Sequence, residues 1–140
     1  MLFVTAGESM DFSLLHRGVK NIAVTKPKLL LQIEGGAVLP GAGIFYHQLH
    51  GSWLWFALLF LIPDFTMLGY AANRKVGAVF YNLGHTYTAP FLVLSILWLC
   101  GQTSSSWLML IWFAHIGFDR LLGYGLKYET AFKDTHLQRL

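Results

Sequence analysis

Four long apolar segments leave this chain few folds to choose from. They cover about residues 28–48, 52–72, 76–99 and 106–126 of the 140-residue sequence. A helix needs about 20 mostly apolar residues to cross the hydrocarbon core of a bilayer, where every backbone polar group must be bonded internally. Each of the four segments is long enough. We therefore expect an all-α integral membrane protein.

The composition agrees with this expectation. Hydrophobic residues make up 55% of the chain and charged residues only 12%, against about 25% charged in an ordinary soluble domain. A net charge of +3 needs no nucleic-acid partner, because basic residues collect on the cytoplasmic side of membrane proteins. We expect membrane lipids as partners and no nucleic acid. The single cysteine, Cys100, excludes an intrachain disulfide.

The linkers and the basic residues predict the topology. Short polar linkers rich in Gly, Asn and Ser force neighbouring segments to run antiparallel, which gives a four-helix up-down-up-down bundle. All ten Lys and Arg residues fall on one side of that bundle, so both termini are expected in the cytoplasm. The chain should be a multi-pass protein of the plasma membrane. The basic residues are Arg17, Lys20, Lys26, Lys28, Arg74, Lys75, Arg120, Lys127, Lys133 and Arg139.

Two terminal segments flank the single transmembrane domain, residues 28–126. Residues 1–27 lack a recognisable signal peptide and read as a surface or poorly ordered segment, in which Met10 is an alternative start. Residues 127–140 form a cytoplasmic tail, for which two interpretations stay open. The tail either lies against anionic lipid or folds back as a lid over the inner mouth. In the second case Asp134 and His136 would offer polar groups to a substrate.

Three carboxylates lie inside the apolar segments, at Glu34, Asp64 and Asp119. A charge at the centre of a span costs roughly 2.5–3.5 kcal/mol, and such residues mark functional sites by default. With a rise of about 1.5 Å per residue, the antiparallel arrangement puts all three roughly 9–17 Å from the cytoplasmic boundary. His85 and His115 fall at the same depth. The sequence thus predicts one polar layer in the inner half of the bundle.

The spacing within this layer favours a metal site. His115 and Asp119 are four residues apart and Asn82 and His85 three apart, so each pair shares a helix face. Metal sites in helical bundles are assembled from such carboxylates and histidines. We predict a divalent ion, Zn, Mn or Fe, supported by Asn82. Its ligands would be Asp64, His85, His115 and Asp119, with Glu34 as a further ligand or the catalytic general base.

Three runs resemble one known family. They are Ile-Pro-Asp-Phe-Thr-Met-Leu-Gly-Tyr at 62–70, Tyr-Asn-Leu-Gly-His-Thr-Tyr at 81–87 and His-Ile-Gly-Phe-Asp-Arg at 115–120. With the tail they resemble the DUF4260 family over about residues 28–140. That resemblance implies a compact bacterial four-span membrane protein and no assigned reaction. A weaker resemblance is to the YdjM-like inner-membrane metal-dependent hydrolases, whose repeated acids after Pro-Asp are replaced here by Phe65 and Thr66.

Several functions are compatible with the polar layer, and the sequence leaves open whether the protein is an enzyme. We favour a metal-dependent hydrolase acting from the cytoplasmic side. The alternatives are a proton or cation carrier or channel subunit, a haem protein with His85 and His115 as axial ligands, and a structural or partner-binding protein. In the last case protonated acids hold the helices together. Arg120 is expected to snorkel to the inner interface.

Overall fold

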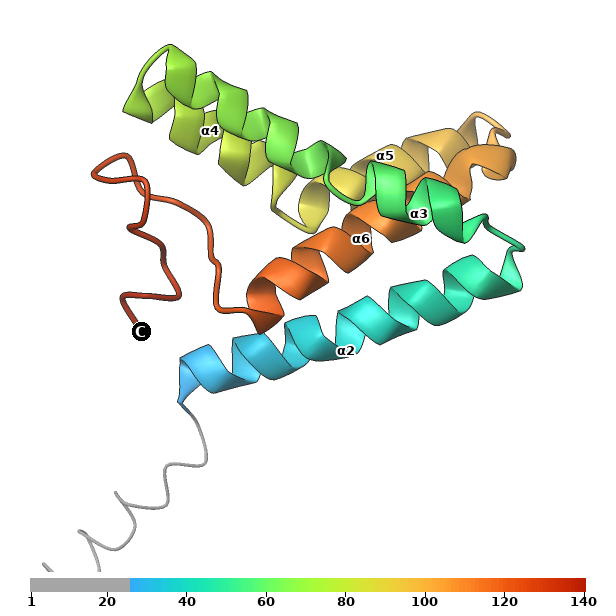
Figure 1. The fold of residues 1–140 in the computed structure, drawn as a ribbon. Helices are drawn as coiled ribbons and strands as arrows, with labels where there is room; N and C mark the ends of the chain where they lie inside the picture. Colours follow the sequence, from blue (N-terminus) through green and yellow to red (C-terminus); the bar gives the residue numbers. More distant parts are fainter. Residues whose placement is uncertain (1–25) are drawn as a thin grey trace, which may run out of the picture.

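The structure, a computed structural model, describes residues 26–140. The helices nearest its two ends run side by side, and a second pair of helices lies at an angle to them (Figure 1). Within these residues the chain is helical and forms no β-strand, which confirms the all-α prediction. In chain order the elements are α2 (Pro27–Gln48), α3 (Trp53–Leu59), the 3-10 helix η1 (Ile62–Ala71), α4 (Arg74–Gly84), α5 (Thr88–Leu99), the short 3-10 helix η2 (Thr103–Ser105) and α6 (Ser106–Leu121). Nearly all of the predicted N-terminal segment lies outside the described residues.

The second apolar segment is helical throughout but not uniform. It begins as α3 and changes to the tighter η1 helix at Ile62. Pro63 has no N–H to donate to the preceding turn, so the α-helical hydrogen bonding stops there. The Thr66 hydroxyl then donates to the Pro63 carbonyl at 2.6 Å. The 3-10 helix therefore begins two residues before Asp64.

The third apolar segment, predicted as one helix over 76–99, is two. Helix α4 starts at an Asn73 cap, whose side chain accepts from the Val76 N–H at 2.9 Å, and it ends at Gly84. The chain turns at His85, and α5 begins at Thr88 with Pro90 in its first turn. Proline is tolerated in the first turn of a helix but not in its interior, so the break between the two helices falls before Pro90. Four uninterrupted antiparallel helices are therefore not confirmed.

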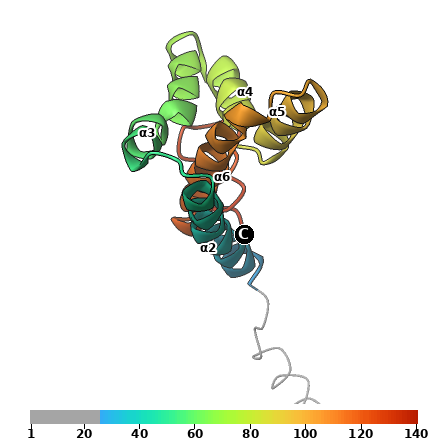
Figure 2. The same ribbon diagram turned by 90° about the vertical axis from the view of Figure 1, so that its right-hand side faces the viewer.

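Two close pairs of helices organise the packing. Helix α2 lies along α6, η1 packs against α4, and α5 contacts α6 (Figure 2). Helices α2 and α6 cross at Gly35 and Gly117. A Cβ added to Gly35 would lie 2.7 Å from the Gly117 carbonyl oxygen, and one added to Gly117 would lie 2.8 Å from the Gly35 carbonyl oxygen. Only glycine allows backbones to approach this closely.

Large apolar side chains cover the outside of the described part of the molecule. Leu99 is 81% exposed, and Leu68 and Trp98 are also largely exposed. Two helical stretches, Pro27–Gln48 and Trp53–Ala71, are long and apolar enough to cross a membrane, while Thr88–Leu99 is apolar but shorter. An extensive apolar exterior marks a surface that contacts lipid or another protein.

The tail after α6 folds back beside the η1–α4 pair. Helix α6 ends at Leu121, five residues before the predicted end of the fourth span at 126. Gly123, with φ +86°, follows its last turn. Lys127 then forms an antiparallel bridge with Thr135. Arg74 donates to the Thr130 carbonyl at 3.3 Å, and the Tyr70 and Phe132 rings meet edge to face. The tail is thus held against the bundle.

The crossing of α2 and α6 predicts a selective effect of added methyl groups. Gly35→Ala and Gly117→Ala should each destabilise the protein by about 1–3 kcal/mol, because the added Cβ meets backbone atoms that cannot move aside. Gly41→Ala, also on α2, meets nothing within 4 Å and is the matched control. Thermal unfolding midpoints in detergent measure the difference. Equal midpoints for all three variants would contradict the close crossing.

Candidate metal centre

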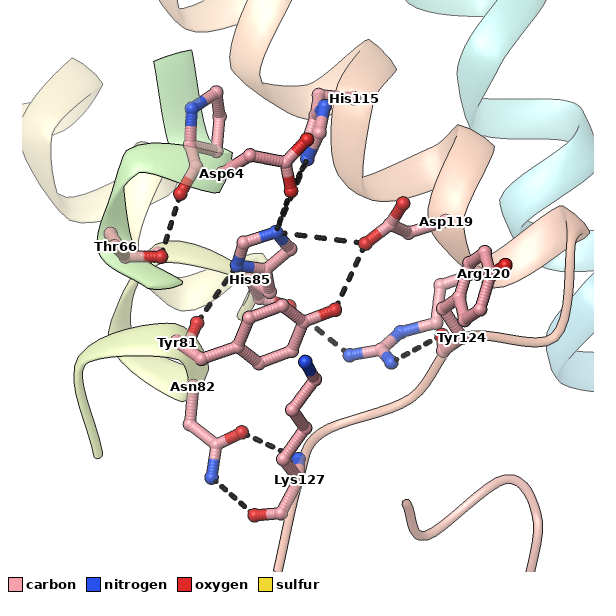
Figure 3. A network of polar contacts seen from close by, with 12 residues as sticks. Asp64, Thr66, Tyr81, Asn82, His85, His115, Asp119, Arg120, Tyr124 and Lys127 are labelled. Atoms are coloured by element: carbon pink, nitrogen blue, oxygen red, sulfur yellow. Dashed lines mark hydrogen bonds and ion pairs between the residues drawn. The ribbon is translucent and has the colours of Figure 1, made fainter. Parts of the chain in front are cut away.

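Three side chains from separate elements meet where η1, α4 and α6 come together (Figure 3). They are Asp64 from η1, His85 from the end of α4 and His115 from α6, and one ligand atom of each lies within 4.8 Å of the others. The two Nε2 atoms are 3.2 Å apart. Asp64 Oδ1 lies 3.4 Å from Nε2 of His85 and 3.6 Å from Nε2 of His115. The structure therefore brings these three predicted ligands together.

Asp119, the fourth predicted ligand, lies beside this group. Its Oδ2 is 3.6 Å from His85 Nε2 and accepts a hydrogen bond from the Tyr81 hydroxyl at 3.1 Å. The Tyr81 ring stacks on the His85 imidazole with 3.8 Å between centroids. Tyr81 is a residue that the sequence interpretation missed, although its position four residues before His85 puts both on one helix face.

The end of α4 orients the His85 imidazole. His85 Nδ1 lies 2.9 Å from the Tyr81 carbonyl oxygen, and a carbonyl only accepts, so Nδ1 carries the hydrogen. In the neutral ring Nε2 then has a free lone pair that points at His115 and the carboxylates. Metal-binding histidines are typically held in this way by a backbone carbonyl. His115 Nδ1 is buried without a partner in the described part of the chain.

The imidazoles are buried and the carboxylates reach a cavity. His85 and His115 are each 1% exposed, whereas the Asp64 side chain is 33% and that of Asp119 14% exposed. Both acids line a cavity of about 610 Å³ between η1, α6 and the tail. A ligand entering this cavity would meet the carboxylates first. The histidines are buried beside the carboxylates and do not line the cavity.

Arg120 does not snorkel to the interface, and that prediction is wrong. Its side chain is 8% exposed and donates to the His85 carbonyl at 3.1 Å and to the Tyr124 carbonyl at 3.0 Å. The last carbonyls of a helix have no partner within it. Since α4 ends beside α6, the His85 carbonyl takes a donor from the neighbouring helix. Arg120 thereby fixes the backbone that carries His85.

The Asn82 side chain holds the tail and makes no hydrogen bond to a histidine side chain within residues 26–140. Its Nδ2 donates to the Lys127 carbonyl at 2.9 Å, and its Oδ1 accepts from the Lys127 N–H at 2.7 Å. The Asn82 amide thus bonds both the N–H and the carbonyl of one residue, as a residue on a neighbouring β-strand would. These two bonds fix the tail at Lys127. Asn82 thus supports the site by positioning Lys127.

The Lys127 ammonium lies within an aromatic cage. It is 3.3 Å from the Phe132 ring centroid and 4.1 Å from that of Tyr81, distances typical of cation–π contacts. The residue is 8% exposed. Burial lowers the pKa of Lys127 to about 8, although the charges of Asp119 and Asp64 raise it. A nearly buried lysine beside two acids is the second group that sequence interpretation missed.

The remaining predicted residues lie apart from the histidines. Glu34 is exposed on α2 and makes no hydrogen bond or ion pair within residues 26–140. Asp134 pairs with Arg139 and Thr130, which lowers the pKa of its carboxyl to about 2. His136 Nδ1 accepts from the Leu126 N–H at 2.8 Å. Asp134 and His136 therefore brace the tail itself.

Comparison with known proteins adds one finding. The family model described as a domain of unknown function, DUF4260, matches residues 28–140. No curated protein and no solved structure matches the chain. The geometry of the site must therefore carry any functional conclusion.

The Asn82 bonds predict that one substitution releases the tail. Asn82→Ala leaves the Lys127 N–H and carbonyl without partners, a loss of about 1–3 kcal/mol for buried groups. Trypsin should then cleave at Lys127 and Lys133 at least about tenfold faster than in the unmodified protein. Gln102→Ala, exposed at the far end of the bundle, is the control. Unchanged cleavage in Asn82→Ala would show that other contacts hold the tail.

The buried ammonium predicts a pH dependence of stability. Lys127 has a pKa of about 8 in the folded chain against an ordinary value of 10.5, so between these values the unfolded chain binds more protons. Stability should therefore rise as the pH increases from about 8 toward 10. The measurement is the unfolding midpoint of the unmodified protein minus that of Lys127→Met across this range. A difference that falls or stays constant would contradict the burial of the charge.

Proposed function

The chain belongs to the DUF4260 family, and because that family has no known function, we propose one from the site: a membrane-embedded metal centre that performs hydrolysis from the cytoplasmic side. The ligands in this proposal are Asp64, His85 and His115. Asp119 lies beside them as a fourth ligand or as the group that accepts a proton. Zn, Mn or Fe is the proposed ion, because the donors are nitrogen and oxygen.

The spacing of the donor atoms is the observation that carries this proposal. Metal–ligand bonds of about 2.0–2.1 Å in a tetrahedral zinc site put neighbouring ligand atoms about 3.3 Å apart. The three ligand atoms here are separated by 3.2, 3.4 and 3.6 Å. Hydrogen bonds donated by nitrogen are about 2.7–3.2 Å long, so the separations of 3.4 and 3.6 Å to Asp64 exceed them. The group is spaced as ligands around an ion are.

The chemistry of the donors also fits a cation. Two imidazole Nε2 atoms that face each other repel through their lone pairs unless a proton or a metal lies between them. A cation balances the charges of Asp64 and Asp119, which are only 33% and 14% exposed and are therefore partly removed from water. A bound divalent ion supplies a Lewis acid and a water of lowered pKa. Asp119 Oδ2, held by the Tyr81 hydroxyl, is placed at the cavity to accept a proton.

The membrane part of the proposal rests on the exterior and on the two helix breaks. In our proposal the chain crosses the plasma membrane four times with both termini in the cytoplasm, and lipids cover its apolar surface. The second and fourth passes are α3–η1 and α6, and the third is α4–α5. Interrupted helices inside a bilayer are tolerated where they line a cavity or a binding site. The breaks at Pro63 and His85 adjoin the centre.

The main alternative is proton or cation transport through the same acids. Asp64 and Asp119 both line the cavity, as carboxylates in a transport path would. That function requires release of the ion at each cycle, whereas a resident metal is retained. A purely structural network would need neither. Glu34, exposed on α2, contributes no contact in support of its predicted catalytic role.

Metal content tests the proposal directly. Protein purified in detergent without chelator should retain close to one Zn, Mn or Fe per chain by elemental analysis. His115→Ala should lower this to near zero, because the third donor is lost while the helix remains. His47→Ala, an exposed histidine at the outer end of α2, should change nothing.

Two outcomes would overturn it. One is a metal content near zero that persists after each of the three metals is added. The other is pH-dependent proton flux in liposomes that disappears in Asp64→Asn while metal is absent, which would establish the transport alternative.

A further inference from the structure

The tail contributes polar residues to the cavity in front of the candidate metal centre. Lys127, Lys133, Thr135 and Gln138 line it together with Asp64 and Asp119. The four tail residues all carry hydrogen-bond donors. Once a divalent cation offsets the two carboxylates, the remaining charge in the lining comes from the two lysines. The cavity is then suited to an anion.

Two of these donors are buried and have no anionic partner in the described chain. The Lys127 ammonium points toward the Tyr81 hydroxyl and Asp119 (Figure 3) but makes no ion pair within 4 Å among residues 26–140. The Thr135 hydroxyl belongs to a residue that is 2% exposed and has no hydrogen-bond partner there. Unpaired buried donors are rare in proteins. A ligand with several oxygens would satisfy both.

Apolar side chains also line the cavity. They include Met67, Phe118 and Leu122, and hydrophobic residues on the neighbouring outer surface, Leu121 and Leu68, are exposed. An anion alone would leave these apolar side chains without contacts. A molecule with a charged head and a hydrocarbon chain fits both kinds of lining, and the surrounding bilayer supplies such molecules.

We propose that the cavity binds an amphiphile with a phosphate monoester head, and that Lys127, Lys133 and Thr135 recognise its phosphoryl oxygens. This inference rests on the proposed metal-dependent hydrolysis and names its substrate class. In the reaction the water oxygen bonds to phosphorus and the bond from phosphorus to the ester oxygen breaks. The products are inorganic phosphate and an alcohol, whose oxygen takes a proton. No oxidant or further reactant is needed.

Lys127 and Lys133 differ in how firmly they are held, and this difference sets their roles in binding the anion. Asn82 fixes the backbone of Lys127, and the Tyr81 and Phe132 rings hold its ammonium, so the ammonium stays in place without a substrate. A preorganised charge gains more from an anionic ligand than a mobile one does. Lys133 is exposed and reaches the cavity from the tip of the tail. It contributes charge with less positional constraint.

The test measures binding of short-chain phosphatidate to the full chain in detergent by calorimetry, with and without added zinc. Phosphatidylcholine of the same chain length and glycerol 3-phosphate are compared, and released phosphate is measured in parallel. Phosphatidate should bind at least about tenfold more tightly than either, since only it has both parts. Zinc-loaded protein should release phosphate from it.

Variants assign the recognition to the tail. Lys127→Met should weaken phosphatidate binding at least about tenfold through loss of a charge-assisted hydrogen bond, whereas Lys127→Arg should restore most of it. Because Asn82 bonds only the backbone of residue 127, both variants should keep the tail resistant to trypsin at Lys133. Lys75→Met, which removes an exposed charge on α4, is the control and should bind normally.

The outcomes separate this inference from the metal proposal. If the protein retains metal but binds phosphatidate and phosphatidylcholine equally well, the assignment of a phosphate monoester head is overturned and the metal proposal stands. Binding or hydrolysis of glycerol 3-phosphate as strong as that of phosphatidate would overturn the amphiphile and indicate a soluble phosphate ester. Binding unaffected by Lys127→Met would overturn the assignment to the tail. Absence of retained metal would instead refute the proposed function.

Discussion

The interruption of helical hydrogen bonding at two places governs the rest of this structure. At Pro63 an α-helix gives way to a 3-10 helix, and at His85 a helix ends beside α6. Each interruption leaves backbone groups that need partners from elsewhere. The Thr66 hydroxyl and the Arg120 guanidinium provide them. Because Asp64 and His85 lie at these interruptions, the same constraint that breaks the helices also aims their side chains.

The second layer of organisation is the attachment of the tail. A tail of polar and aromatic residues gains little from packing against lipid, so it depends on specific bonds. Asn82 holds the backbone of Lys127, and Tyr81 and Phe132 hold its ammonium. The tail therefore closes one side of the cavity with lysines and a buried hydroxyl. It converts a group of carboxylates and histidines into a pocket with both acidic and basic walls.

Part of the site followed from depth and spacing alone. Asp64, His85, His115 and Asp119 were expected at one level because antiparallel helices of known rise place them there, and their atoms do lie close together. Glu34 shares that depth but faces outward from α2, since depth fixes position along a helix and not direction around it. The prediction for Arg120 was wrong for a different reason. Its long side chain could reach the interface, but an unbonded carbonyl of His85 lies nearer.

The sequence by itself determined that the described chain is helical, that its surface is apolar, and that a few acids and histidines lie within it. Those properties follow from composition and from residue order along each segment. Only the tertiary structure decided where the helices break, which acid faces the histidines, and that the tail returns to cover them. These depend on contacts between residues far apart in the chain, such as Asn82 with Lys127 and His85 with Arg120. No local pattern encodes such contacts.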